Sequence, residues 1–204
     1  MNFLAHLYLS GENNDIIIGN FIADHVKGNS TEQFGNGIRT GIALHRAIDL
    51  FTDTHPVVRG AVDRLRPDYR KYAGVIVDMY FDHFLAAGWQ NWSEEPLSGF
   101  TERMYGLLMA SFEILPPRTR HMLPHMVKHD WLLNYGNFEG LHLALSGMAH
   151  RTPFMSMMET AADKLIDDYS FYHDSFVAFF PELKRYTDGV RVETDLDSTP
   201  VCFY

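Results

Sequence analysis

The sequence has few of the residues that cross-link a chain or divide it into parts. It contains one cysteine, Cys202, among 204 residues. Neither an internal disulfide nor a cysteine-based metal site can form, and we expect a reducing, cytoplasmic location. No Gly/Ser-rich or Pro-rich linker interrupts the chain, so we predict one domain over residues 1–204, with a C-terminal extension from about residue 188.

Cations and long apolar runs are also scarce. The 17 Lys and Arg residues are outnumbered by 26 Asp and Glu, which gives a formal net charge of −9. Because nucleic-acid-binding proteins neutralise phosphates with basic surfaces, we expect no nucleic-acid partner. The apolar opening MNFLAHLYLSG is too short to span a bilayer and lacks a basic leading segment, so we expect no membrane association and no export.

Apolar and aromatic residues make up 46% and 14% of the sequence. They recur mainly with helical spacing and seldom alternate with polar residues, which predicts an all-α, irregular helical bundle. A long helix containing GIALHRAIDLFTD is expected to end before His55-Pro56. Other helices are expected to break at Pro67, Pro96, Pro116, Pro153 and Pro181.

Two acids and a histidine lie inside the apolar segment VIVDMYFDHFL. Asp78 and Asp82 are four residues apart and so share one helix face, with His83 at its edge. Two carboxylates held this close repel each other, and burial costs roughly several kcal/mol per ion. We therefore expect an arginine, a shared proton or a metal ion to neutralise them, and the apolar neighbours favour a functional role.

The segment HRAIDLFTD repeats this pattern. His45, Asp49 and Asp53 are spaced i, i+4, i+8 and form one polar stripe bordered by apolar residues. Asp24 and His6 are also set into apolar, amphipathic segments. Taken alone, His6 is more typical of a hydrogen-bonded core histidine than of a ligand, Asp24 of a solvated surface acid, and Asp53 of an acid that bonds a turn.

Carboxylates and imidazoles without a thiolate favour a hard or borderline divalent ion. Mn²⁺ and Mg²⁺ fit best, and Fe²⁺ or Zn²⁺ are alternatives. The predicted metal ligands are Asp24, His45, Asp78 and Asp82, followed by Asp49. His121, His125 and His129 also have the i, i+4, i+8 spacing, but we predict a solvated basic face there, because Pro124 should interrupt the helix and cations surround it.

Four segments carry a resemblance to a known family. In order, MNFLAHLYLS, GNFIADHVKGN, GIALHRAIDLFTD and DMYFDHFL resemble the successive blocks of the acyl carrier protein phosphodiesterases, also called acyl carrier protein hydrolases. The likeness is dense over residues 1–90 and continues through LSGMAHR and FFPEL. Adjacent His-Asp pairs occur only outside these blocks, so a search for the dipeptide His-Asp does not by itself locate the metal ligands.

The resemblance implies a fold and a reaction. The family is regarded as a divergent helical branch of the HD-type metal-dependent phosphohydrolases, with Mn²⁺ as the usual ion. Its members remove 4′-phosphopantetheine by hydrolysis from the serine of holo-acyl carrier protein and leave the apo form. Acyl carrier protein is a carrier protein of fatty acid biosynthesis. We therefore expect a hydrolase whose protein substrate is acyl carrier protein.

That reaction requires activated water, a neutralised phosphate and a proton for the leaving serine. A divalent ion supplies the first two, and a histidine supplies the third. His6 and His83 are the candidates for the proton, and neither is preferred. Arg46 can grip phosphate oxygens and Lys27 is a second candidate phosphate contact, although both also fit surface charges.

An acidic carrier protein needs a basic docking surface on this acidic chain. Residues 59–71 hold five basic and two acidic residues, enough to steer such a partner. An ordinary solvated helix is the alternative. The basic residues of this segment are Arg59, Arg64, Arg66, Arg70 and Lys71.

Two other functions remain compatible with the sequence. One is an HD-type phosphohydrolase that acts on a small phosphoester or a nucleotide. The other is a non-catalytic helical protein that binds acyl carrier protein or a metal. The sequence leaves the oligomeric state open.

Overall fold

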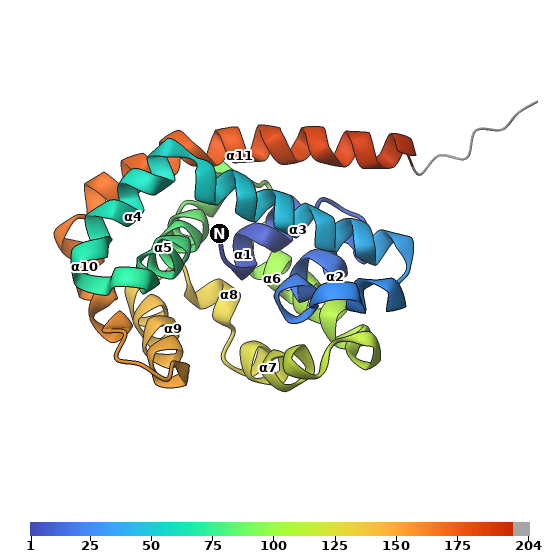
Figure 1. Cartoon of the computed structure of the whole chain (residues 1–204), viewed down its shortest axis with the longest axis horizontal. Coiled ribbons are helices and arrows are strands. Elements are labelled where there is room, and N and C mark those ends of the chain that lie inside the picture. The colour runs from blue at the N-terminus through green and yellow to red at the C-terminus, as the bar shows by residue number, and fades with distance from the viewer. Residues whose placement is uncertain (198–204) are drawn as a thin grey trace, which may run out of the picture.

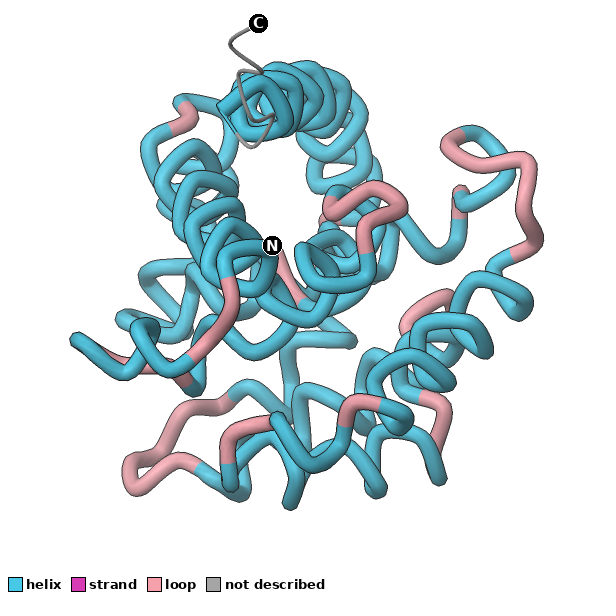
Figure 2. The backbone as a smooth tube through the Cα atoms, turned by 90° about the vertical axis from the view of Figure 1, so that its right-hand side faces the viewer, coloured by secondary structure: helices cyan, strands magenta, loops and turns pink. Residues whose placement is uncertain are grey.

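The chain folds almost entirely into helices, as predicted. The computed structural model describes residues 1–197, and no strand occurs among them (Figures 1 and 2). Within this range no helix is both long enough and apolar enough to cross a membrane. The α-helices are α1 (Phe3–Leu9), α2 (Asn14–Ile22), α3 (Asn36–Thr54), α4 (Pro56–Tyr69), α5 (Ala73–Ala87), α6 (Leu97–Ala110), α7 (Pro117–Lys128), α8 (Trp131–Asn134), α9 (Phe138–Arg151), α10 (Ala161–Asp167) and α11 (Tyr169–Asp197).

Short 3-10 helices form several of the connections. The expected C-terminal extension is continuous with α11 as far as Asp197, and Cys202 lies outside the described residues. The 3-10 helices are η1 (Ala23–His25), η2 (Gly28–Gln33), η3 (Arg70–Tyr72), η4 (Trp89–Asn91), η5 (Phe112–Ile114) and η6 (Met158–Thr160).

Helix α5 lies at the centre of the hydrophobic core. Its residues from Ile76 to Ala86 are buried except Asp78, and α1, α4, α9 and α11 all pack against it. Burial of each large apolar side chain stabilises the fold by about 1.5–3 kcal/mol. The long helix α11 runs along α3 and closes one side of the molecule (Figure 1).

Helices α2 and α3 pack backbone against backbone through two glycines. A Cβ atom on Gly19 would lie 2.0 Å from the carbonyl oxygen of Ile38, and one on Gly41 would lie 2.2 Å from that of Ile16. Only glycine fits such a close approach. Gly19 and Gly41 therefore set the distance between the two helices that carry most of the site described below.

Three prolines lie inside helices. Pro67 is in the last turn of α4, Pro124 is within α7, and Pro181 is within α11. The fixed φ of proline is a helical value, so a helix can continue through it when packing compensates the lost hydrogen bond. The predicted breaks at Pro67 and Pro181 and the interruption at Pro124 are therefore wrong.

Asp82 joins α1 to α5. Its Oδ1 accepts the backbone N–H of Asn2 at 3.1 Å and its Oδ2 accepts that of Leu4 at 2.8 Å, and the side chain is fully buried. N–H groups at the start of a helix have no acceptor within the helix. Burial raises the pKa of Asp82 to about 7, although the amino terminus and these two N–H groups act in the opposite direction.

Asp78, one turn earlier on α5, bonds the amino group of Met1 at 2.8 Å. The partners that neutralise this pair of acids are therefore an ammonium group and backbone N–H groups. In this structure Asp78 and Asp82 contact the start of α1, and neither belongs to the histidine–carboxylate cluster described below. Their ligation of a metal stays a prediction.

Asp82→Ala removes both acceptors and leaves two N–H groups at the α1–α5 junction unpaired. We expect the free energy of unfolding to fall by about 2–4 kcal/mol. Equilibrium unfolding in urea measures the change. The control is Asp167→Ala, which removes an exposed acid at the end of α10 and should change the value by less than about 0.5 kcal/mol. Equal effects of the two substitutions would contradict the proposed capping role.

Candidate active site and metal centre

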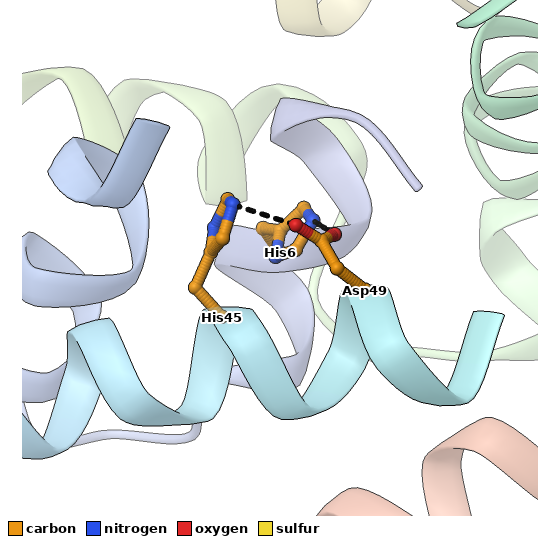
Figure 3. A group of neighbouring side chains, drawn as sticks. All are labelled: His6, His45 and Asp49. Carbon is orange, nitrogen blue, oxygen red and sulfur yellow. Dashed lines mark ion pairs between the residues drawn. The ribbon is translucent and has the colours of Figure 1, made fainter. Parts of the chain in front are cut away.

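Two histidines and an aspartate converge between α1 and α3 (Figure 3). Asp49 Oδ1 lies 3.2 Å from His6 Nε2, and Asp49 Oδ2 lies 3.2 Å from His45 Nε2. The imidazole rings of His6 and His45 stack with their centroids 4.0 Å apart. One ligand atom from each of the three residues lies within 4.8 Å of the others.

Helical periodicity and one turn of 3-10 helix explain this convergence. His45 and Asp49 are four residues apart on α3 and rise from the same face of it, while His6 reaches them from α1 (Figure 3). Asp24 lies in η1, directly after α2, and its Oδ1 is 3.3 Å from His45 Nε2. Asp24 is 66% exposed, so it connects the buried histidines to the surface.

Asn20 on α2 fixes the orientation of both imidazole rings. Its Nδ2 donates to the carbonyl oxygen of His6 and to Ser10 Oγ, which leaves Oδ1 as an acceptor. His6 Nδ1 donates to this Oδ1 at 2.8 Å. His45 Nδ1 lies 2.9 Å from the backbone oxygen of Asn20 and 3.1 Å from Oδ1. Both histidines therefore carry a proton on Nδ1 and direct Nε2 at Asp49.

This arrangement is what a metal ion requires. A ligating histidine commonly donates its second ring N–H to an oxygen, which fixes the ring with the other nitrogen toward the metal. His6 Nε2 is buried and has no hydrogen-bond partner among the described residues, although it is close to Asp49. A lone pair held against a carboxylate needs a cation between them, so the donor set of His6, His45 and Asp49 fits a divalent ion, with Asp24 beside it at His45.

The pKa values of His45 and Asp49 also indicate that this cluster favours a positive charge at its centre. Burial by itself lowers the pKa of His45, but the carboxylates of Asp24 and Asp49 outweigh it and raise this pKa to about 9. Burial acts to raise the pKa of Asp49, but the two histidines hold it well below its usual range. Burial lowers the pKa of His6. Without a metal, a proton on His45 therefore supplies the cation.

A cavity of about 850 Å³ opens beside the cluster, and Asp24 belongs to both. Helix α9 forms one wall, and the lining combines apolar residues, among them Val75 from α5 and Leu143, Ala144 and Met148 from α9, with polar and charged ones. Asp78 and the first residues of the chain line the same space. Cavities of this size and polarity take small-molecule ligands or a substrate side arm.

The structure separates the other predicted site residues from this cluster. His83 is buried against Phe138 and Tyr169, and its Nδ1 donates to the carbonyl oxygen of Tyr135 at 2.7 Å. Arg46 and Lys27 are exposed, and neither lines the cavity.

Sequence reasoning missed three parts of the site. Asn20 carries a weak signal, because it lies one helical turn before Asp24 and is polar within an apolar segment. His25 lies on the cavity wall next to Asp24, and no sequence pattern singled it out. The sequence did not indicate that one face of α9 lines a cavity, since its residues resemble those of any amphipathic helix.

An all-helical fold in which two buried histidines meet carboxylates beside a cavity of about 850 Å³ defines a class of helical bundles whose sites are built from side chains on facing helices. The model of one family, described as acyl carrier protein phosphodiesterase, matches residues 1–183. The chain therefore belongs to the acyl carrier protein phosphodiesterase family and is an enzyme of the phosphodiesterase class.

Individual relatives agree with this assignment. A protein of Enterobacter sp. (strain 638) named acyl carrier protein phosphodiesterase is 32% identical over 184 residues, which cover 90% of this chain and 95% of that protein. A protein of the same name from Escherichia coli O45:K1 (strain S88 / ExPEC) is 33% identical over the same shares. One from Serratia proteamaculans (strain 568) is 29% identical over 91% of this chain and 96% of that protein. No solved structure matches the chain.

In the metal-free protein we expect the His45 ring to titrate near pH 9, above its ordinary value of 6.5. Because the folded pKa is raised, the protonated ring stabilises the fold fully below pH 6.5, and this contribution is lost as the pH rises toward 9. An NMR titration of the ring measures the pKa. Asp24→Asn and Asp49→Asn should each lower it, whereas Glu102→Gln, at an exposed acid on α6, should not. A His45 pKa unaffected by Asp24→Asn and Asp49→Asn would contradict this account.

Proposed function

We propose that this protein is a metal-dependent phosphodiesterase that hydrolyses the serine-linked 4′-phosphopantetheine of holo-acyl carrier protein and leaves the apo protein. One observation carries the proposal: Asp24 belongs both to the histidine–carboxylate cluster and to the lining of the 850 Å³ cavity. A phosphodiester at this point would meet the cluster with its pantetheine arm in the cavity. The names of the family and of its relatives point to the same substrate.

The proposed metal ligands are His6, His45, Asp49 and Asp24. His6 was expected to act in proton transfer, but its Nε2 is directed at the same carboxylate as that of His45. Mn²⁺ is the favoured ion, with Mg²⁺ or Fe²⁺ as alternatives. When bound, such an ion lowers the pKa of a water molecule and neutralises charge on the phosphate.

The chain itself provides positioning and a proton. Asn20 holds both rings with Nε2 toward the centre, so no ring has to reorient during the reaction. His25 lies on the cavity wall, and we assign it the proton for the leaving serine, because His83 does not line the cavity. The kinship with HD-type phosphohydrolases and the cytoplasmic location stay predictions.

Incubation of holo-acyl carrier protein with the enzyme and Mn²⁺, followed by mass spectrometry of the intact carrier, tests the proposal. The carrier should lose the mass of phosphopantetheine, and a chelator should prevent the loss. His45→Ala removes one predicted ligand and should reduce the rate by at least about 10³-fold and weaken Mn²⁺ binding, measured by calorimetry.

His150→Ala is the matched control, because His150 is exposed on α9 and lines neither the cavity nor the cluster. It should retain both activity and Mn²⁺ affinity. A nucleotide panel run in parallel separates a nucleotide phosphohydrolase from the proposed enzyme. An unchanged carrier mass with every metal would refute the proposed reaction.

Ala144→Phe fills part of the cavity from the α9 wall without touching the cluster. We expect KM for holo-acyl carrier protein to rise about tenfold or more, because the arm loses its space, while Mn²⁺ affinity is kept. Steady-state kinetics and calorimetry measure the two quantities. Ala43→Phe, at an exposed alanine on α3, controls for the added ring. An unchanged KM in Ala144→Phe would show that the arm lies elsewhere.

A further inference from the structure

A second groove, of about 680 Å³, lies next to the cavity and is lined mainly by cations and histidines. We call it the basic groove. His121 and His125 belong to α7, and His129 caps the end of that helix. The residues used to define the groove are His25, Arg118, His121, His125, His129 and Arg151.

The groove follows one stripe of α7. Arg118, His121, His125 and His129 recur at i, i+3, i+7 and i+11, which places them on one side of the helix. Pro124 does not disturb this stripe, since the helix continues through it. The four side chains are exposed, so the stripe faces the groove and the solvent.

The charge of this region is opposite to that of the chain as a whole. Residues 117–129 contain Arg118, Arg120 and Lys128 and no acid, in a chain whose formal net charge is −9. Within residues 1–197, neither Arg118 nor Arg151 forms an ion pair, although Arg151 lies over the ring of Trp131 at 6.0 Å. These positive charges are therefore available to a partner.

The basic groove is continuous with the cavity of the candidate active site. His25, Met122, His129, Trp131 and Arg151 line both spaces. A partner seated in the groove would thus be in contact with the mouth of the cavity. A side arm carried by that partner could enter the cavity and reach Asp24.

The basic segment at residues 59–71 is a weaker docking surface than the sequence suggested. Arg64 bonds Asp168, and Arg66 pairs with Asp63 on the same helix, so their charges are largely compensated. Lys71 lies over the ring of Phe154 at 4.4 Å. Helix α4 also lies across the molecule from α7, and none of these residues lines the cavity (Figure 1).

We propose that the basic groove is the docking surface for the acidic face of the carrier protein whose phosphopantetheine arm enters the adjacent cavity. This inference rests on the proposed function and specifies where its protein substrate binds. Opposite charges steer such a complex together and fix its orientation, so they act on KM more than on the chemical step.

The test compares two double charge reversals of equal size. Arg118→Glu/Lys128→Glu reverses Arg118 of the basic groove and Lys128, an exposed cation on the same helix, and Arg59→Glu/Arg66→Glu reverses two exposed cations on α4. For holo-acyl carrier protein, the α7 variant should raise KM about tenfold or more with kcat nearly unchanged. The α4 variant should leave KM near the wild-type value. Added salt should raise the wild-type KM more than that of the α7 variant.

A short uncharged peptide that carries the same phosphopantetheine-serine ester reports on the active site alone. Both variants should cleave it with a KM close to the wild-type value, which also shows that each is folded; Arg118 acts electrostatically on His25, so KM and not kcat is compared. Arg118→Gln/Lys128→Gln should give an intermediate KM for the carrier protein. If wild-type enzyme cleaves the carrier but the α7 reversal leaves KM unchanged, or the α4 reversal raises it equally, docking in the basic groove is refuted. No cleavage by wild-type enzyme would instead refute the proposed function.

Discussion

The side chain and backbone oxygens of Asn20 determine how the rest of the site is arranged. They accept the Nδ1–H groups of His6 and His45, so both rings direct Nε2 at Asp49. Asn20 can make these contacts only because α2 lies directly against α3. The two helices can pack this closely because Gly19 and Gly41 lie at their contact, where a Cβ at either position would collide with a backbone carbonyl. Two glycines and one amide thus define the geometry of the centre.

Two sets of carboxylates, of which only Asp82 is fully buried, have different partners. Asp82 accepts backbone N–H groups and Asp78 an ammonium group, so both are neutralised within the chain. Asp49 faces two imidazole nitrogens, and only a proton or a metal ion satisfies that arrangement. The first pair stabilises α1 on α5, and α1 in turn carries His6. The structural acids therefore support the proposed functional one.

The site has a consistent electrostatic organisation from surface to centre. This acidic chain carries a region of cations and histidines, on α7 and at Arg151, and this region adjoins a cavity with both apolar and polar walls. Asp24 lines this cavity and contacts His45 of the cluster. In the proposed function, charges at the surface would act on the encounter with a partner, the cavity would accommodate an arm, and the histidine–carboxylate cluster would act on the bond that is cut.

The sequence alone determined the all-α fold, the stripe of His45 and Asp49, and the family blocks, because helical periodicity and short motifs are local properties. It placed Asp24 and His6 among the candidates. It did not separate structural from proposed functional acids: Asp78 and Asp82 have the same i, i+4 spacing as His45 and Asp49. Only the tertiary structure decided this, because the identity of each partner, an amino terminus for Asp78 and two imidazoles for Asp49, depends on contacts between residues distant in the chain.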